Sequence, residues 1–251
     1  MKITAIIAAR MGSSRLPGKS LMPILGKPML ERMIERVRHS CHIDEIILAT
    51  TKLSNDDQLE NFADEIGVGC FRGSVDDVLG RINQAVATSR ADLAVELLGD
   101  NPLVHADLID DVIDFYLENQ YDYCVSATSE HPHAGNDIYK FPIGIRVEVF
   151  NPDVLNKCGK LAVDAYHREN TTSFIYHSPE IFSTGYFEAR GKWLPLNRPE
   201  VTFAVNYQEN YDLVARIFEK CYPVDANFSL FTMMETFDSL PELWNLMGSQ
   251  E

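Results

Sequence analysis

The sequence predicts an α/β fold built around a mostly parallel sheet. Over the first 127 residues, apolar runs alternate with stretches whose apolar residues recur every three or four positions. This alternation is typical of βαβ units, which lay their strands side by side in parallel. The chain has 251 residues, 45% of them apolar and 24% charged. A chain of this length can bury a core without metals or disulfides, so we expect one domain over residues 1–251.

The strands and helices of this first half are predicted in alternation. Strands are expected at residues 3–9, 45–50, 67–71, 92–97 and 121–126. Helices are expected near residues 28–39, 56–66, 75–88 and 106–119. Ser54 and Ser74 are candidate N-caps, and Pro28 suits a first helical turn.

The pattern changes after about Glu130. The remaining elements are expected as a loop at 131–136, a strand at 143–150, a helix at 163–176, strands at 182–188 and 202–206, and a helix at 208–221. The tail from Phe228 mixes aromatic residues and methionines without charge runs, so we expect it to pack on the body. Residues 130–187 are interpreted as an inserted lobe.

The charge balance narrows the class of partner. Lys and Arg number 22 against 37 Asp and Glu, a formal charge of −15, which argues against nucleic acid and anionic membrane as partners. The first 38 residues are nonetheless basic, with only Glu31 and Glu35 as acids. Their cations are Lys2, Arg10, Arg15, Lys19, Lys27, Arg32, Arg36 and Arg38. An acidic chain with one basic end suggests a local site for a small anion.

Cysteine usage and the amino-terminal segment suggest a cellular location. The five cysteines are widely separated and show no metal-ligand spacing, so they are interpreted as reduced, packed thiols. The apolar run at residues 3–9 is too short for a signal peptide or a membrane span. We therefore expect a cytoplasmic protein.

The most informative segment is residues 8–19, which read AARMGSSRLPGK after a predicted strand. A Gly/Ser-rich loop at the carboxyl end of a parallel strand can direct backbone N–H groups at phosphates, and the cations add charge. The spacing is one residue too long for a Walker A loop and does not match GxGxxG. A solvated basic loop would leave this composition unexplained, so we predict a triphosphate site. Its residues are Ala8, Ala9, Arg10, Gly12, Ser13, Ser14, Arg15 and Lys19.

A second segment, residues 95–104, reads VELLGDNPLV. Asp100 follows an apolar strand that Pro102 ends, so its carboxylate is expected in the same crevice as the first loop. There it could hold Mg²⁺ bound to phosphates, although a simple turn aspartate before a helix is the alternative. Its shared location with the basic loop favours the metal role.

At this point the sequence resembles the cytidylyltransferases that activate acidic sugars. The resemblance rests on the loop at 8–19, LMPILGKPML at 21–30, FRGSVDDVL at 71–79 and GDNPL at 99–103. It covers roughly residues 3–219 and is strongest to the SpsF type, related to the CMP-Kdo and CMP-acylneuraminate synthetases. This resemblance implies a Rossmann-like nucleotide-diphospho-sugar transferase fold, with residues 130–187 as a small dimerisation and sugar-binding lobe of a homodimer.

The implied reaction is Mg²⁺-dependent: CTP and a small acidic sugar give a CMP-sugar and pyrophosphate, for surface polysaccharide or glycan synthesis. By matching motif, Arg10, Arg15, Lys19 and Asp100 would be catalytic. Ser13 would contact the triphosphate, and Arg72 and Ser74 would lie near base and ribose. The alternatives are another nucleoside triphosphate or sugar phosphate as substrate, or a nucleotide-binding homologue without catalysis. The sequence does not identify the sugar.

Two residues depart from the family pattern. Residues 143–150 read IGIRVEVF, with Arg146 where SpsF-type sequences carry Asp. This arginine could change acceptor preference, abolish the family's ordinary chemistry, or pair with a carboxylate at a subunit interface. Residues 202–210 read TFAVNYQEN, with Asn206 where the family's second metal-binding Asp stands. We expect Asn206 to ligate Mg²⁺ together with Asp100, more weakly than a carboxylate would. Arg168 and Glu169, in YHRENTT at 166–172, could approach the sugar or a partner subunit, and a purely structural role is the alternative.

Overall fold

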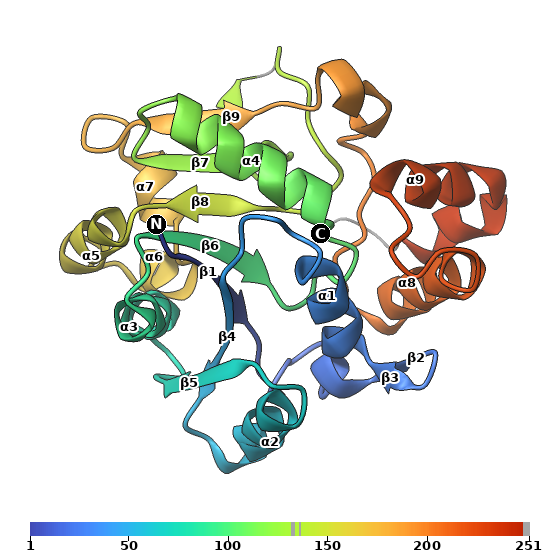
Figure 1. Cartoon of the computed structure of the whole chain (residues 1–251), viewed down its shortest axis with the longest axis horizontal. Coiled ribbons are helices and arrows are strands. Elements are labelled where there is room, and N and C mark those ends of the chain that lie inside the picture. The colour runs from blue at the N-terminus through green and yellow to red at the C-terminus, as the bar shows by residue number, and fades with distance from the viewer. Residues whose placement is uncertain (132–133, 136, 248–251) are drawn as a thin grey trace.

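The computed structural model describes residues 1–131, 134–135 and 137–247. A seven-stranded sheet in the order β5-β4-β1-β6-β8-β7-β9 forms its centre, running from bottom to top in Figure 1. The strands are β1 (Ile3–Ala8), β4 (Glu45–Thr51), β5 (Gly69–Gly73), β6 (Leu93–Leu98), β7 (Tyr123–Ser126), β8 (Glu148–Phe150) and β9 (Thr184–Phe187). Only β8 pairs antiparallel with its sheet neighbours. The predicted mostly parallel α/β sheet is confirmed.

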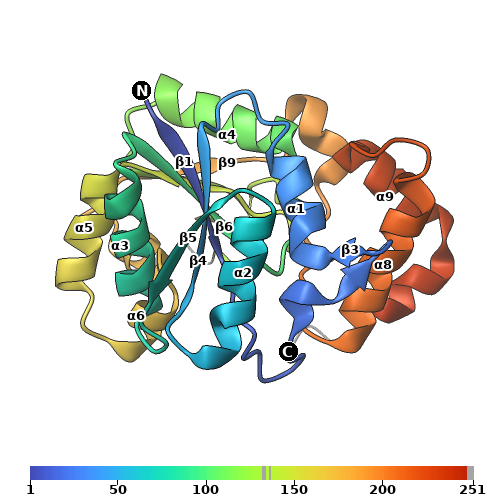
Figure 2. The ribbon, with the colours of Figure 1, turned by 60° about the horizontal axis from the view of Figure 1, so that its bottom comes forward.

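Helices cover both faces of this sheet. They are α1 (Met29–Val37), α2 (Asp57–Glu65), α3 (Val78–Ser89), α4 (Ala106–Glu118), α5 (Pro152–Leu161), α6 (Ala165–Glu169), α7 (Ser173–His177), α8 (Gln208–Cys221) and α9 (Leu230–Ser239). Short 3₁₀ turns lie at Lys19–Leu21, Ser54–Asp56, Gly191–Leu196 and Pro241–Leu246, and a β-ribbon joins β2 (Pro23–Ile24) to β3 (Lys27–Pro28). Figure 2 shows α3 and α5 on one side of the sheet and α1 on the other.

The apolar runs of the sequence form strands because both sheet faces are buried. In β1, Ile3 and Ile7 pack in a core with α1, α2 and α4, while Ile6 packs on the opposite face with α3 and α5. The tail also packs on the body, as expected. Phe228 and Phe237 are buried beside α8, in the same core as α1, α2 and α4. Among the described residues, no helix combines the length and apolar character needed to cross a membrane.

The strand predicted at 143–150 is mostly absent, and only Glu148–Phe150 pairs within the sheet. Ile143 makes one isolated parallel bridge to Thr202, which is also all that remains of the strand predicted at 202–206. The reason lies at Gly144, whose φ is +99° and whose missing Cβ would lie 2.3 Å from the nitrogen of Ala204. Two backbones that approach this closely cannot continue a regular ladder.

The helix predicted at 163–176 is divided into α6 and α7, with non-helical backbone at Asn170 between them. Helix α5 was not predicted. Its N-cap is Asn151, whose side chain accepts a hydrogen bond from the Asp153 N–H at 2.8 Å, and Pro152 is its first residue.

Both predicted N-caps are wrong. Ser54 lies inside a 3₁₀ turn ahead of α2. The cap of α3 is Asp77, which accepts a hydrogen bond from the Gly80 N–H at 2.8 Å, while Ser74 in turn accepts from the Asp77 N–H at 3.1 Å. Asp77 competes better than Ser74 for the N–H groups of α3, because a carboxylate is a stronger acceptor than a hydroxyl.

Residues 130–187, predicted to form an inserted lobe, supply β8 and β9 to the central sheet. Strand β8 lies between β6 and β7, and α5 and α6 pack against α3. This segment is therefore continuous with the body, and its role in dimerisation stays a prediction. The loop predicted at 131–136 lies partly outside the described residues, because 132, 133 and 136 are not among them.

Candidate active site

A cavity of about 280 Å³ opens where β1 and β6 end. In open α/β sheets, ligands bind at the carboxyl ends of strands where the chain leaves in opposite directions, and β1 lies between β4 and β6 at such a point. We call this space the outer cavity. Its lining residues are Ala8, Ala9, Arg10, Ser13, Ser14, Arg15, Lys19, Ser20, Val78, Arg81, Leu98, Gly99, Asp100, Glu169, Asn170 and Asn206.

A close backbone approach joins the two strand ends. The Gly99 N–H donates to the Ala8 carbonyl at 2.9 Å. A Cβ on Gly99 would lie 2.7 Å from that oxygen and 2.9 Å from the Ala9 Cβ, closer than real Cβ contacts come. Glycine at this position therefore allows the strand end that carries Asp100 to lie directly beside the basic loop.

The basic loop is fixed at both ends. The Met11 N–H donates to Asp56 Oδ1 at 2.7 Å, and the other carboxylate oxygen of Asp56 accepts from the Thr51 hydroxyl. The Gly18 N–H donates to the Met11 carbonyl at 2.9 Å, with Gly18 at φ +76°, a conformation that favours glycine. These bonds hold the loop over the strand ends, so no ligand is needed to turn its cations toward the cavity.

Lys19 brings two distant parts of the chain together. Its Nζ lies 3.1 Å from Asp100 Oδ2 and donates to the Val205 carbonyl at 2.6 Å. The Val205 N–H donates in turn to the Asp100 carbonyl at 2.9 Å. Asn206 follows immediately, and its Oδ1 accepts from Arg15 at 2.8 Å. Asp100 and Asn206 therefore lie in one cavity, each held by a cation of the basic loop.

These two side chains suit a magnesium ion. Mg²⁺ takes oxygen donors and needs only one or two from protein when phosphates and water supply the rest. The carboxylate of Asp100 and the amide oxygen of Asn206 both line the outer cavity and offer that chemistry. The residues present therefore fit the ion.

Three residues predicted for nucleotide binding do not line the outer cavity in the described part of the chain: Gly12, Arg72 and Ser74. Gly12 is exposed. Arg72 donates to the Thr51 and Leu53 carbonyls at 2.9 and 2.8 Å and pairs with acids of α2. The Ser74 hydroxyl is bonded in the α3 cap. A contact with base or ribose would require Arg72 and Ser74 to leave these partners, and it stays a prediction.

Sequence reasoning missed Arg81, which is 3% exposed and lines the outer cavity. Its Nη1 donates to the Ser74 carbonyl at 2.6 Å, while its Nε has no hydrogen-bond partner among the described residues. Burial, and the neighbouring charge of Arg10, lower the pKa of this guanidinium. A detectable signal existed, because Arg81 falls on the buried stripe of α3 beside Ile82.

A second space of about 120 Å³, the inner cavity, adjoins the outer one. The two share Ala8, Val78, Leu98, Glu169 and Asn170. The inner cavity continues between β6, β8 and α7, and its other lining residues are Glu96, Arg146, Glu148, Thr171, Thr172, Ser173 and Tyr176. Glu169 thus lies at the junction of both spaces.

Arg146 finds its carboxylate partners within its own chain. Its Nε lies 3.1 Å from Glu148 Oε1 and its Nη1 lies 3.3 Å from Glu130 Oε2. Burial opposes the charge, but Glu148 and Glu130 outweigh it and raise the pKa of the guanidinium above its usual value. Arg168 is likewise engaged, since it donates to the Gly159 carbonyl at 2.8 Å and pairs with the α3 cap residue.

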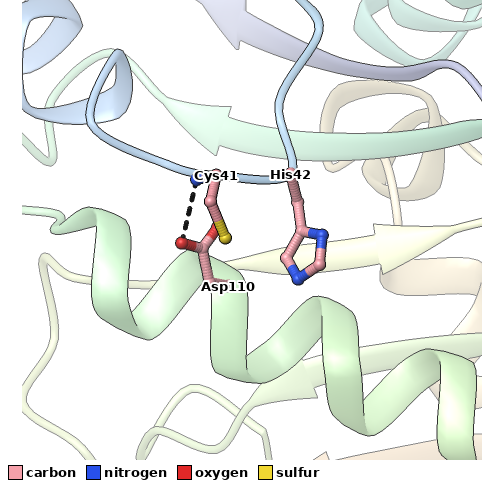
Figure 3. Close-up of side chains that lie close together, drawn as sticks. All are labelled: Cys41, His42 and Asp110. Carbon is pink, nitrogen blue, oxygen red and sulfur yellow. Dashed lines mark hydrogen bonds between the residues drawn. The ribbon is translucent and has the colours of Figure 1, made fainter.

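A separate group of possible metal ligands precedes β4, where Cys41 and His42 approach Asp110 of α4 (Figure 3). The Cys41 N–H donates to Asp110 Oδ2 at 3.0 Å, and His42 Nε2 lies 2.9 Å from Asp114 Oδ1. A side-chain hydrogen bond between the Cys41 thiol and Asp110 raises the pKa of that thiol, which disfavours the thiolate that a metal requires. These side chains already have protein partners, in keeping with a structural role.

The fold and the outer cavity define a nucleotidyltransferase of the α/β class, with a cationic loop facing a carboxylate across two strand ends. A family model described as cytidylyltransferase matches residues 4–244, and the chain belongs to this family of enzymes.

The chain is also similar to individual proteins. The chain is 38% identical to the uncharacterized protein MJ1063 of Methanocaldococcus jannaschii, over 98% of this chain and 94% of the relative. It is 29% identical to the spore coat polysaccharide biosynthesis protein SpsF of Bacillus subtilis, over 87% of each. Over 46% of this chain and 48% of the relative, it is 38% identical to the 8-amino-3,8-dideoxy-manno-octulosonate cytidylyltransferase of Shewanella frigidimarina.

A solved cytidylyltransferase of Leptospira borgpetersenii superimposes with a TM-score of 0.87. It is 26% identical to this protein, and the superposition covers 100% of this chain and 99% of the Leptospira chain. A CMP:2-keto-3-deoxy-manno-octonic acid synthetase solved with CTP shares the fold, with a TM-score of 0.65 at 18% identity over 88% of this chain and 99% of its own.

Proposed function

We propose that this enzyme transfers CMP from CTP to a hydroxyl of an acidic sugar, with release of pyrophosphate and dependence on Mg²⁺. The observation that carries the proposal is the outer cavity, where three cations of the basic loop (Arg10, Arg15 and Lys19) face Asp100 and Asn206. The names of two relatives support the sugar class, since one acts in polysaccharide synthesis and another on an octulosonate.

The reaction needs no protein nucleophile. The sugar oxygen forms a bond to the α-phosphorus as the bond from that phosphorus to the oxygen bridging to the β-phosphate breaks, and the hydroxyl proton passes to water. Negative charge grows on the departing pyrophosphate, where Arg15 and Lys19 are positioned to stabilise it. The fixed loop and strand ends keep the reactants aligned, which reduces the entropic part of the barrier.

Asp100 and Asn206 are the residues that would hold Mg²⁺. The ion would supply charge neutralisation and orientation of the triphosphate when bound. Lys19 holds the Asp100 carboxylate through its 3.1 Å contact, so this donor is already oriented toward the cavity.

A homodimer formed through residues 130–187 is part of the same proposal. Apolar side chains of this segment are exposed around α5 and α6, including Leu161 at 44%, Val163 at 90% and Tyr166 at 53%. Burying such a group against a second copy would remove it from water. A cytoplasmic location stays a prediction.

A pyrophosphate-release screen tests the proposed reaction. The four common nucleoside triphosphates are crossed with octulosonates, nonulosonates, neutral sugars and sugar phosphates, with and without Mg²⁺. We expect release with CTP and a sugar acid, and none without the metal. Release only with another nucleotide or a sugar phosphate would favour the related-substrate alternative. CTP binding without release for any acceptor would favour a homologue without catalysis.

A further inference from the structure

The inner cavity has room for one end of a sugar. Its volume of about 120 Å³ equals that of roughly four water molecules at liquid density. It adjoins the outer cavity along Ala8, Val78 and Leu98, so a molecule that reacts in the outer cavity can extend into it. The remaining question is which chemical group its walls accept.

The walls of the inner cavity are acidic. Apart from the phenol of Tyr176, the ionisable groups that line this cavity are three carboxylates and one guanidinium. They belong to Glu96, Glu148, Glu169 and Arg146. The single cation is already engaged at 3.1 Å by Glu148 and at 3.3 Å by Glu130. Among the described residues of this wall, a carboxylate that entered would therefore meet more negative than positive charge, and the one guanidinium is already ion-paired with two glutamates.

One carboxylate oxygen of Glu96 lacks a hydrogen-bond donor among the described residues. It is 2% exposed on β6, and one side-chain hydrogen bond joins it to Thr171. Its Oε2 has no hydrogen-bond partner among the described residues. Burial, and then the charge of Glu148, raise the pKa of Glu96 to about 8. A buried oxygen without a donor is costly to the folded protein, and a bound cationic donor would relieve that cost.

We propose that the inner cavity binds an ammonium group of the acceptor, at the end of the sugar remote from the reacting hydroxyl, with Glu96 as its principal receptor. This inference rests on the proposed function and assigns the acceptor to the amino-sugar acids. In a 2-keto sugar acid, the anomeric hydroxyl and the carboxylate are on adjacent carbons, so both face the cations of the outer cavity. The opposite end then extends toward Glu96 and the hydroxyl-rich wall at Thr172 and Tyr176.

Two acceptors that differ in one group test the inference. The probes are 3-deoxy-manno-octulosonate and its 8-amino-8-deoxy counterpart, each assayed with CTP and Mg²⁺ at pH 8.5, above the pKa of about 8 to which burial and Glu148 raise the Glu96 carboxyl. We expect kcat/KM to be at least tenfold higher for the amino acceptor, the lower end of what one charge-assisted hydrogen bond contributes.

Glu96→Gln should lower kcat/KM for the amino acceptor at least tenfold more than for the hydroxyl acceptor, because the amide removes the charge while keeping the shape. Glu45→Gln is the matched control. Glu45 pairs with Lys2 at 2.9 Å, lines neither cavity, and should leave the ratio between the acceptors at its wild-type value.

Direct binding separates this inference from the proposed function. Calorimetry measures the dissociation constants of both acceptors for the wild-type protein loaded with Mg²⁺ and a non-hydrolysable CTP analogue, so the result does not depend on whether any variant folds. A binding preference for the amino acceptor without pyrophosphate release overturns the proposed function and supports the inference. Turnover of both acceptors without such a preference supports the function and overturns the inference, as does binding of neither acceptor.

Discussion

Replacing Lys19 with alanine should weaken CTP binding far more than it weakens folding. The substitution removes an ammonium group from the centre of the outer cavity, 3.1 Å from Asp100 Oδ2. A hydrogen bond to a charged group contributes about 1.5–3 kcal/mol. At 1.4 kcal/mol for each tenfold change, loss of one such bond to a phosphate raises the dissociation constant about 10- to 150-fold.

The cost to folding is smaller because the pair is partly hydrated. The Lys19 side chain is 13% exposed and its Asp100 partner 26% exposed. A pair near the surface contributes roughly 0–1 kcal/mol, so the melting temperature should fall by only a few degrees. The binding change should therefore exceed the stability change by roughly 0.5–3 kcal/mol.

Isothermal titration of CTP in the presence of Mg²⁺ measures the first quantity, and thermal unfolding measures the second. Lys27→Ala is the control. Lys27 pairs with Glu31 and Glu35 at 2.6 and 2.7 Å and lies outside the outer cavity, so its loss should leave CTP affinity unchanged. If Lys19→Ala binds CTP within twofold of the wild-type protein, the triphosphate does not occupy the basic loop.

Four further predictions concern the same structure. Arg15→Ala should raise the dissociation constant of CTP about tenfold by titration, because it removes a cation that lines the outer cavity and bonds Asn206; unchanged affinity contradicts it. Asp100→Asn should reduce pyrophosphate release at least a hundredfold, whereas Asn206→Asp should retain it and lower the Mg²⁺ concentration for half-maximal rate; full activity of Asn206→Ala would exclude that side chain as a ligand. Because the folded state holds the Glu96 proton up to a pKa of about 8, against an ordinary value of 4.5, unfolding free energy should fall as pH rises from about 4.5 to 8. Glu96→Gln should flatten this fall in denaturant titrations, and an unaltered pH profile argues against the shift. Sedimentation at micromolar concentration should show a dimer that Val163→Asp weakens, and a monomeric wild-type protein rules out the dimer.

The first half of the fold could be predicted because its strands are buried on both faces. Strand β1 and its neighbours β4 and β6 appear in the sequence as continuous apolar runs, and their bounds agree with prediction to within one or two residues. The second half could not be predicted as well. Alternation at 143–150 suggested a full strand, but the contact of Gly144 with a distant segment interrupts it, and local pattern carries no information about that contact.

The two cavities also differ in how far the sequence predicts them. The basic loop and Asp100 follow directly from their positions at strand ends, a rule that holds for open α/β sheets in general. The inner cavity combines β6, β8 and the break between α6 and α7, which sequence spacing does not bring together. One signal was present: Glu96 interrupts an otherwise apolar strand, and a carboxylate at a position buried on both faces needs a reason to be there.

The contact around Gly144 also joins the chain segments that lead to the two cavities. The Ile143 N–H donates to the Val201 carbonyl at 3.0 Å, and the Phe203 N–H donates to the Ile143 carbonyl at 2.7 Å. Arg146 lies three residues beyond Ile143 in the chain, and Asn206 lies three residues beyond Phe203. Two main-chain hydrogen bonds therefore tie the backbone that leads to Arg146 to the backbone that leads to Asn206. Side-chain substitutions at Arg146 or Asn206 remove neither bond, because neither residue takes part in them.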